Sequence, residues 1–199
     1  NNQNINNLFT LPSGRIIEPH GGKLVRQFID DQNDNDTCEI IVSEEILTDS
    51  FQIANGTYSP LDAFMNLEEM ESVLYNNSIN GLVTWTIPII FQVHKEMIKG
   101  MPESGFVYLK KENDIHSNII LKINKIEKLK HKNKLAQLWF DTQDIKHPGV
   151  SKFLSSGDYV ISGKPYILNN FCSKGENKYE LTPSQSRFIF DHNGWHNVI

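Results

Sequence analysis

The stretch from Ala54 to Met65 limits the possible fold more than any other part of the chain. Its sequence, Ala-Asn-Gly-Thr-Tyr-Ser-Pro-Leu-Asp-Ala-Phe-Met, is too irregular for a strand and too apolar for a free loop. Asn55-Gly56 is typical of a tight turn that needs positive φ, and Ser59-Pro60 predicts a second extended or turn step. Several apolar side chains can hold this turn against a core: Tyr58, Leu61, Phe64 and Met65. We expect an ordered turn on which another part of the protein rests.

The composition is that of an ordinary globular chain. Of 199 residues, 39% are hydrophobic and 22% are charged, which suits one domain, or one domain plus part of another. No run approaches the ~18 apolar residues of a membrane span, and residues 1–7 lack the basic and apolar regions of a signal peptide. We therefore expect a cytoplasmic protein without a membrane partner, in which Cys38 and Cys172 are reduced thiols.

The order of predicted elements favours an α+β fold built on a small β-barrel with flanking short helices. Asn66 can cap a helix that runs through Tyr75, because Glu68 and Glu69 follow in its first turn. Pro88 assigns the strand that contains it to an edge or a bulge. Strands are expected at 39–47, 86–93, 105–109, 115–126 and 158–168, and further helices at 134–140 and 148–154. Residues 122–134 are expected to form a lysine-rich hairpin.

A strong helix start lies near the end of the chain. Thr182 can cap the helix, Pro183 suits its first position, and Gln185 completes a capping box. Gly194 is expected to end this helix, and apolar residues from Trp195 onward resemble the beginning of a buried strand. A helix that feeds an apolar strand at this point predicts a structural unit whose remainder is missing.

The sequence resembles ATP sulfurylases (sulfate adenylyltransferases) over nearly its whole length. The resemblance rests on motifs that share their order and spacing with that family: Pro19-His20-Gly21-Gly22, Ala54 to Met65, Trp85-Thr86-Ile87-Pro88-Ile89, Asp144 with His147-Pro148-Gly149-Val150, Gly157-Asp158, Gly163, Leu181-Thr182-Pro183 with Arg187, and Gly194-Trp195. The sequence departs from the family at Thr86, where a proline is usual, and in the lysine-rich segment.

The resemblance implies two structural units. Residues 1–168 would be the PUA-like N-terminal domain, and residues 169–199 would be a linker and the first helix of the catalytic nucleotidyltransferase domain. The family's catalytic motifs, Gln-x-Arg-Asn and His-x-x-His, do not occur in the chain. The resemblance thus implies no catalytic residue and no cofactor in this chain, whereas the full-length parent would use ATP with Mg.

The implied role is scaffolding for a catalytic domain of the same polypeptide, with possible homo-oligomer contacts. The reaction joins sulfate to the α-phosphate of ATP and releases pyrophosphate. Candidate residues for the interface between the domains are Pro19, His20, Gly21, Gly22, Asn55, Gly56, Tyr58, His147 and Arg187. For His20, beside Glu18, an acid/base role is the alternative to a turn residue. For His147, an anion contact is the alternative to a helix-entry cap.

The alternative function is a free-standing PUA-like module that binds RNA or a protein. Its best support is a basic run formed by Lys122, Lys125, Lys128, Lys130, Lys132 and Lys134. The net charge of −5 argues against nucleic acid, because phosphate binding needs a basic footprint. A metal site is not expected either: Gly194 separates His192 from His196, and the acidic loop 30–36 lacks the pattern of a calcium-binding loop.

Overall fold

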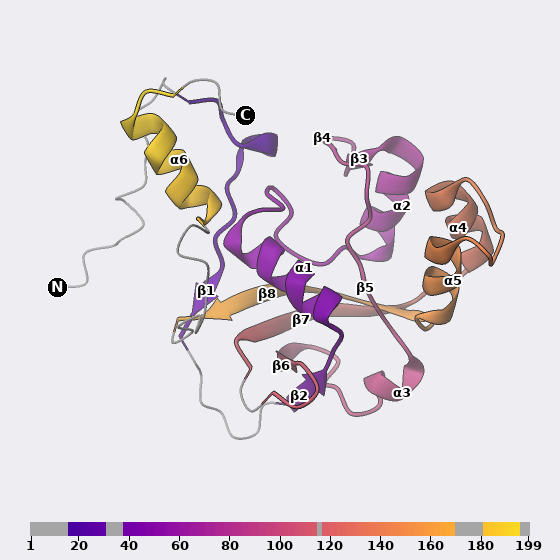
Figure 1. Ribbon diagram of the computed structural model, residues 1–199. Helices are drawn as coiled ribbons and strands as arrows, with labels where there is room; N and C mark the ends of the chain where they lie inside the picture. The colour runs from indigo at the N-terminus through magenta and orange to yellow at the C-terminus, as the bar shows by residue number, and fades with distance from the viewer. Residues whose placement is uncertain (1–15, 31–37, 115–116, 170–180, 196–199) are drawn as a thin grey trace.

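The computed structural model describes residues 16–30, 38–114, 117–169 and 181–195 (Figure 1). The strands are β1 (Phe28–Ile29), β2 (Cys38–Ile41), β3 (Ser78–Ile79), β4 (Val83–Thr84), β5 (Phe91–Val93), β6 (Gly105–Lys110), β7 (Ile119–Lys128) and β8 (Tyr159–Leu168). The helices are α1 (Glu44–Asn55), α2 (Leu67–Asn76), α3 (Lys95–Ile98), α4 (Lys132–Phe140), α5 (Pro148–Ser155) and α6 (Pro183–His192), and a 3₁₀ turn covers His20–Gly22.

Strand β8 is the centre of the main sheet. It pairs antiparallel with β7 along its length, parallel with β1, and antiparallel with β5. The sheet continues from β7 through β6 to β2, in the order β1-β8-β7-β6-β2. The described strands therefore form an open path that ends at β1 and β2, and they do not close into a ring. The expected α+β class is confirmed, whereas the closed form of the small barrel is not seen among these strands.

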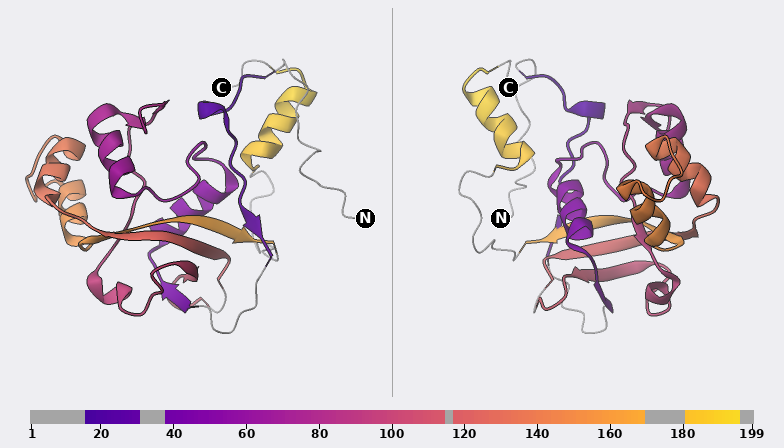
Figure 2. Two further views of the ribbon diagram at one scale, coloured as in Figure 1. Left: turned by 180° about the vertical axis from the view of Figure 1, so that it is seen from behind. Right: turned by 45° about the vertical axis from the view of Figure 1, so that its right-hand side comes forward.

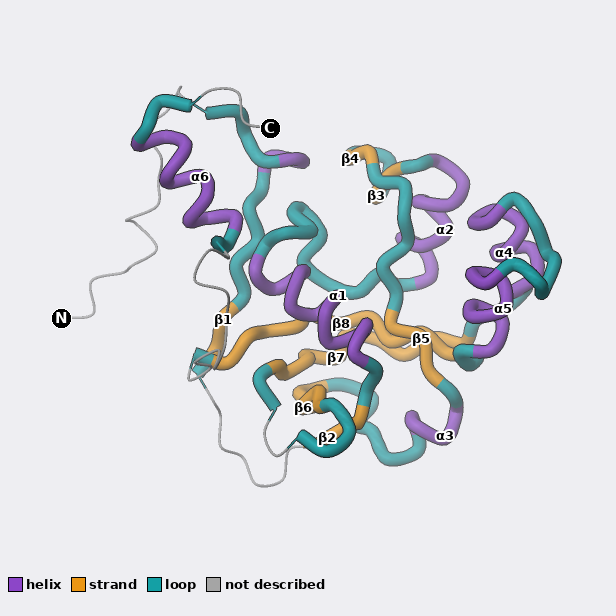
Figure 3. Tube along the Cα trace, in the orientation of Figure 1, coloured by secondary structure: helices purple, strands orange, loops and turns teal. Residues whose placement is uncertain are grey.

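The helices cover the sheet unevenly. Helix α1 lies across one face of the β7–β8 pair, with which it is in contact (Figure 1). Helices α2, α4 and α5 gather at one end of that pair, and α6 lies at the other end beside the N-terminal segment (Figure 2). The segment that joins β4 to β5 runs between these groups as a loop (Figure 3). A group of three helices thus lies at one end of the sheet and the single helix α6 at the other.

Two hydrophobic clusters hold these layers together. The larger joins α1 and the Leu61–Met65 segment to the sheet, and Phe64 and Phe91 are its largest fully buried side chains. The smaller one joins α2, α4 and α5 and contains Met70, Leu135 and Phe153. Each buried side chain of this size stabilises the fold by about 1.5–3 kcal/mol. The apolar residues of the opening stretch thus do hold it against the core, as the sequence predicts.

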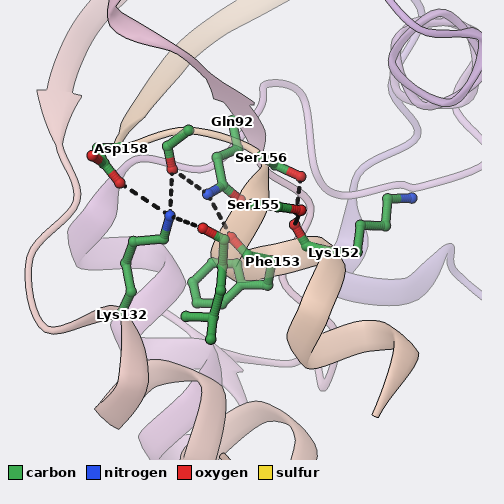
Figure 4. A network of polar contacts seen from close by, with 9 residues as sticks. Gln92, Lys132, Lys152, Phe153, Ser155, Ser156 and Asp158 are labelled. Carbon is green, nitrogen blue, oxygen red and sulfur yellow. Dashed lines mark hydrogen bonds and ion pairs between the residues drawn. The ribbon is translucent and has the colours of Figure 1, made fainter. Parts of the chain in front are cut away.

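A polar network fixes α5 to the sheet (Figure 4). The Lys132 ammonium donates to the carbonyl oxygens of Leu154 and Gly157, both at 2.7 Å, and pairs with the Asp158 carboxylate at 3.0 Å. The Gln92 side-chain amide donates to the same Gly157 carbonyl at 2.6 Å. These donors satisfy carbonyl groups that the end of a helix leaves without an intrahelical partner. One lysine of the basic run is therefore a structural residue.

The predicted helix caps are confirmed. The Asn66 side chain accepts a hydrogen bond from the Glu69 amide, the Glu69 carboxylate accepts one from the Asn66 amide, and α2 follows. Thr182 and Gln185 form the same reciprocal pair at the start of α6. The predictions for β6, β8, α4 and α5 are confirmed within one or two residues. Caps are predictable because they depend on local side-chain geometry alone.

The strand predicted at 39–47 is wrong beyond Ile41. Ser43 instead caps helix α1, which runs to Asn55, and Gly56 ends it with a left-handed φ of 96°. Asn55-Gly56 thus closes a helix rather than a free turn. Residues 39–47 include both β2 and the first turn of α1. Together these two segments give an alternation of apolar and polar residues that is typical of a single strand. Glu44 and Glu45 directly follow Ser43, and acidic residues in this position favour the first turn of a helix.

Two further predictions are corrected. Only Phe91–Val93 of the expected strand 86–93 is extended in the sheet, because Pro88 offers no amide for a ladder. Residues 122–134 are the end of β7, a short loop and the start of α4, not a hairpin. The acidic loop predicted at 30–36 lies outside the described residues apart from Asp30, and so do Cys172 and the apolar residues Val198 and Ile199.

Gly56→Ala should destabilise the protein more than Gly81→Ala. Both glycines have positive φ, 96° and 70°, but a Cβ at Gly56 would lie 2.2 Å from the Val25 carbonyl oxygen, whereas Gly81 has nothing within 4 Å. We expect a loss of about 1 kcal/mol for Gly81→Ala from backbone strain, and about 3 kcal/mol or more for Gly56→Ala. Urea unfolding of both variants measures the difference, and equal losses would contradict the close approach.

Candidate functional site

The end of α1 holds the N-terminal segment in place. The Gln27 amide donates to the Ala54 carbonyl at 2.8 Å, and the Val25 amide donates to the Ser59 hydroxyl oxygen at 2.9 Å. Because Gly56 lacks a Cβ, its backbone can lie directly against Val25. The opening stretch therefore does support another part of the chain, and that part begins at the Pro19–Gly22 motif.

Asn55 and Tyr58 stabilise the same turn from within. The buried Asn55 side-chain oxygen accepts from the amide and the hydroxyl of Thr57, at 2.9 and 2.8 Å. The Tyr58 hydroxyl donates to the Asp49 carboxylate at 3.1 Å. Burial raises the pKa of Asp49 above its usual value, although this hydrogen bond opposes the effect. Burial and the neighbouring Asp49 charge likewise raise the pKa of Tyr58.

His20 joins the N-terminal segment to the β3–β4 hairpin. Its Nε2 lies 2.8 Å from the Thr84 carbonyl oxygen, and its ring centroid is 6.5 Å from that of Trp85. Tyr58 meets Trp85 edge-on at 6.4 Å between ring centroids. Gly21 has a φ of 69°, and a Cβ there would meet the Pro60 ring at 2.5 Å. The glycine therefore lets the His20 turn lie directly on the opening stretch.

We name these residues and their exposed neighbours the His20–Trp85 face and define it as His20, Gly21, Gly22, Tyr58, Leu82, Thr84 and Trp85. Leu82 at the hairpin tip is 87% exposed. Sequence reasoning missed Leu82, Thr84 and Trp85 as members. The Trp85-Thr86-Ile87-Pro88 motif was a usable signal, because a tryptophan in a loop with apolar neighbours suggests a contact surface.

Arg187 extends the surface to α6. Its guanidinium donates to the Ile17 carbonyl oxygen, just before Pro19. Phe188 and Trp195 on the same C-terminal segment are about half exposed, at 48% and 51%. The N-terminal segment therefore contacts both α6 and the hairpin that carries Leu82. Trp195 was expected to begin a buried strand, but its side chain is about half exposed in the described part of the structure.

His147 lies elsewhere. It caps α5, where its Nδ1 accepts from the Val150 amide at 3.4 Å, and its ring is 5.3 Å from that of Phe140. The structure thus gives His147 the helix-entry cap that the sequence favoured over an anion contact. Most of the candidate interface residues lie close together in the structure: Pro19 to Gly22, Asn55, Gly56 and Tyr58. Arg187 is linked to this group by its hydrogen bond to Ile17. His147 lies outside the group.

Asp62, in the same opening stretch, binds two lysines. Its carboxylate lies 2.8 Å from the ammonium groups of both Lys23 and Lys164. Burial acts to raise the pKa of Asp62, but the hydrogen bonds and charges of the two lysines outweigh it, so the pKa lies below its usual value. Lys23 follows the His20 turn, so this ion pair also fixes the N-terminal segment to β8.

Four of the six lysines in the basic run contact different parts of the protein, while Lys128, Lys130 and Lys134 together line one pocket. Lys122 lies over the Phe106 ring at 5.9 Å, Lys125 pairs with Glu127, and Lys134 lies over the Tyr75 ring at 5.5 Å. Lys132 is held inside the network of Figure 4. These separate environments reduce the footprint that RNA binding would need.

Two further features concern membranes and metals. Within the four described ranges, no helix is both long and apolar enough to cross a bilayer. In the same ranges, no group of three or more His, Cys, Asp or Glu side chains is arranged to hold a metal ion. His196, the residue considered with His192 as a metal pair, lies outside the described residues.

The fold agrees with comparisons to known proteins. A family of PUA-like domains matches residues 17–170, which is most of the chain. The chain therefore belongs to the PUA-like domain family. A hexameric APS kinase from Thiobacillus denitrificans has a similar structure, with a TM-score of 0.63 at 17% identity over 90% of this chain and 32% of that chain. At that identity the likeness concerns the fold alone.

Sulfate adenylyltransferases are the relatives by sequence. The chain is 32% identical to those of Pyrococcus abyssi over 194 residues and of Thermococcus onnurineus over 197 residues. In each case the match covers 92% of this chain and 48% of the relative. The predicted resemblance is thus confirmed, and the chain spans about half the length of the curated relatives it matches.

Asp62→Asn should lower the free energy of unfolding at neutral pH, and this loss should shrink as the pH falls. Because the folded state depresses the Asp62 pKa, its stabilisation is present above the unfolded pKa of about 4 and is lost as the pH falls through the lower folded value. We expect a difference of about 1 kcal/mol at pH 7, modest because Lys23 is exposed. Urea unfolding across the range from pH 7 to pH 2, with exposed Glu103→Gln as the control, measures it; a difference that does not shrink as the pH falls below about 4 would contradict the ion-pair origin.

Proposed function

We propose that this chain is the PUA-like part of a sulfate adenylyltransferase, and that it positions the catalytic part of the same polypeptide. In this proposal residues 1–168 form the PUA-like domain, and residues 169–199 form the linker and first helix of the catalytic domain. The observation that carries the proposal is similarity along 92% of this chain to enzymes of which it spans only 48%. The conserved chemistry of those enzymes would then reside in the other half.

The His20–Trp85 face is the proposed contact for the catalytic part. Arg187 on α6 binds the Ile17 carbonyl next to this face, so α6 lies beside the N-terminal segment that carries His20 (Figure 1). Leu82 and Trp195 add exposed apolar area there. Exposed apolar groups of this kind favour a protein contact, and aromatic and arginine side chains are enriched at the centre of such contacts.

The chemistry of adenylyl transfer also supports a catalytic site in another part of the enzyme. Transfer of an adenylyl group from ATP to sulfate brings two polyanions together, and this requires clustered cationic or amide donors at the phosphorus centre. The chain has three arginines, Arg15, Arg26 and Arg187, and Arg187 is engaged by Ile17. We infer that the ATP with Mg, the sulfate and the catalytic residues are bound by the rest of the enzyme. A cytoplasmic location and homo-oligomer contacts are parts of the same proposal.

The 199-residue chain alone should release no pyrophosphate from ATP in a sulfate-dependent way. The physical reason is that the proposed donors at the phosphorus centre lie in the other half of the enzyme. A coupled pyrophosphate assay on the purified chain, with a full-length sulfate adenylyltransferase as the positive control, measures this. Sulfate-dependent turnover by the chain alone would refute the scaffolding role.

Leu82→Glu should weaken attachment of the catalytic part. A polypeptide that continues this chain to the length of its relatives is the protein to use, and Ile145→Glu is the matched control. Ile145 is 69% exposed, lies between α4 and α5, and is not one of the residues of the His20–Trp85 face. We expect Leu82→Glu to increase limited proteolysis between the two parts and to lower sulfate-dependent activity about tenfold, the effect of ~1.4 kcal/mol of lost contact energy. Equal behaviour of the two variants would refute the assigned face.

A further inference from the structure

A cavity of about 600 Å³ lies between α1, the segment after Trp85, and the α4–α5 pair. Its lining is mostly apolar, with a few polar groups at one side. A cavity of this size and character is typical of a small-molecule site. It belongs to a different part of the molecule from the residues that the proposed function uses, apart from a link through Asp49 and Tyr58.

Aromatic side chains from α4 and α5 form one wall. Trp139 stacks on Phe140, with ring centroids 4.9 Å apart at 12°, and meets Phe153 edge-on at 5.4 Å. Gly149 makes this arrangement possible, because a Cβ there would lie 2.6 Å from the Phe140 ring. Aromatic faces carry a negative quadrupole and attract cations. The wall therefore favours an apolar occupant with positive charge.

The opposite side of the cavity is acidic. Helix α1 contributes the carboxylates Glu44, Glu45 and Asp49, and Lys152 is the one ammonium among the residues that line the cavity. Lys152 pairs with Glu45, and Glu44 is held by Lys111 at 2.9 Å. The Asp49 carboxylate accepts a hydrogen bond from the neutral hydroxyl of Tyr58. Among the residues that the structure describes, this half-buried carboxylate has no direct ion pair, although the Lys152 charge acts on it from farther away. A bound cation would supply the missing direct partner.

We propose that this cavity binds a small organic cation, an ammonium group attached to an apolar or aromatic body. The apolar body lies against Trp139, Phe140 and Phe153, and the ammonium group pairs with Asp49. Size, aromatic walls and net negative charge all select this class over an anion or a neutral polar molecule. The Ile87–Ile90 segment, which also lines the cavity, continues directly from Trp85. An occupant therefore contacts the segment that carries the His20–Trp85 face.

Three probes of matched size test the proposal on the chain. They are 2-phenylethylammonium, 2-phenylethanol and 3-phenylpropionate, which differ chiefly in charge. Binding is followed by ¹H–¹⁵N NMR at the Trp139 indole signal, identified by its loss in Trp139→Phe. We expect the ammonium compound to shift this signal, the alcohol to bind about fivefold more weakly, and the carboxylate to bind more weakly still.

Asp49→Asn provides the matched variant. It keeps an oxygen that can accept from Tyr58 but removes the charge, and exposed Glu103→Gln is the control. We expect Asp49→Asn to weaken 2-phenylethylammonium about fivefold and to leave 2-phenylethanol unchanged, while Glu103→Gln changes neither. Equal binding of the three probes by the unmodified protein would overturn the proposal, as would unchanged ammonium binding in Asp49→Asn. These outcomes are independent of pyrophosphate release, so they are distinguishable from failure of the proposed function.

Discussion

The close approach of Gly56 to the Val25 backbone is the contact on which the candidate site depends. It ends α1 in a left-handed residue and leaves no room for a side chain. Hydrogen bonds on either side, from Gln27 to Ala54 and from Val25 to Ser59, then fix the N-terminal segment along the helix end. His20 can reach Thr84 only because this segment is fixed, and Ile17 meets Arg187 at its outer end.

Helix α1 connects the cavity to the His20–Trp85 face. Asp49 lines the cavity and accepts from the Tyr58 hydroxyl, and the Tyr58 ring meets Trp85 in the His20–Trp85 face. One half-buried carboxylate therefore lies between a proposed small-molecule site and a proposed interdomain contact. Burial raises the pKa of Asp49, and a positive charge beside it would act in the opposite direction. The arrangement offers a short physical route by which an occupant could stabilise the turn.

Local chemistry made much of the fold predictable. The capping boxes at Asn66 and Thr182 need only residues three positions apart, so their helices could be placed closely. Helix α1 was missed because its first turn continues the apolar alternation of β2, and Trp85 was missed because its contacts with His20 and Tyr58 are distant in sequence. The different environments of Lys122, Lys125 and Lys132 were not predictable either, because their partners come from elements that are distant in sequence or only meet in the folded sheet.

The sequence by itself determined the family, the α+β class, the capped helices and the special turn around Gly56. These follow from motifs and from interactions between near neighbours, which a linear pattern records directly. Only the tertiary structure decided that His20, Tyr58 and Trp85 share one face, that His147 does not join them, and that aromatic rings of α4 and α5 face the carboxylates of α1 across a cavity. These relations depend on how β8 joins distant segments, and no local pattern encodes such long-range packing.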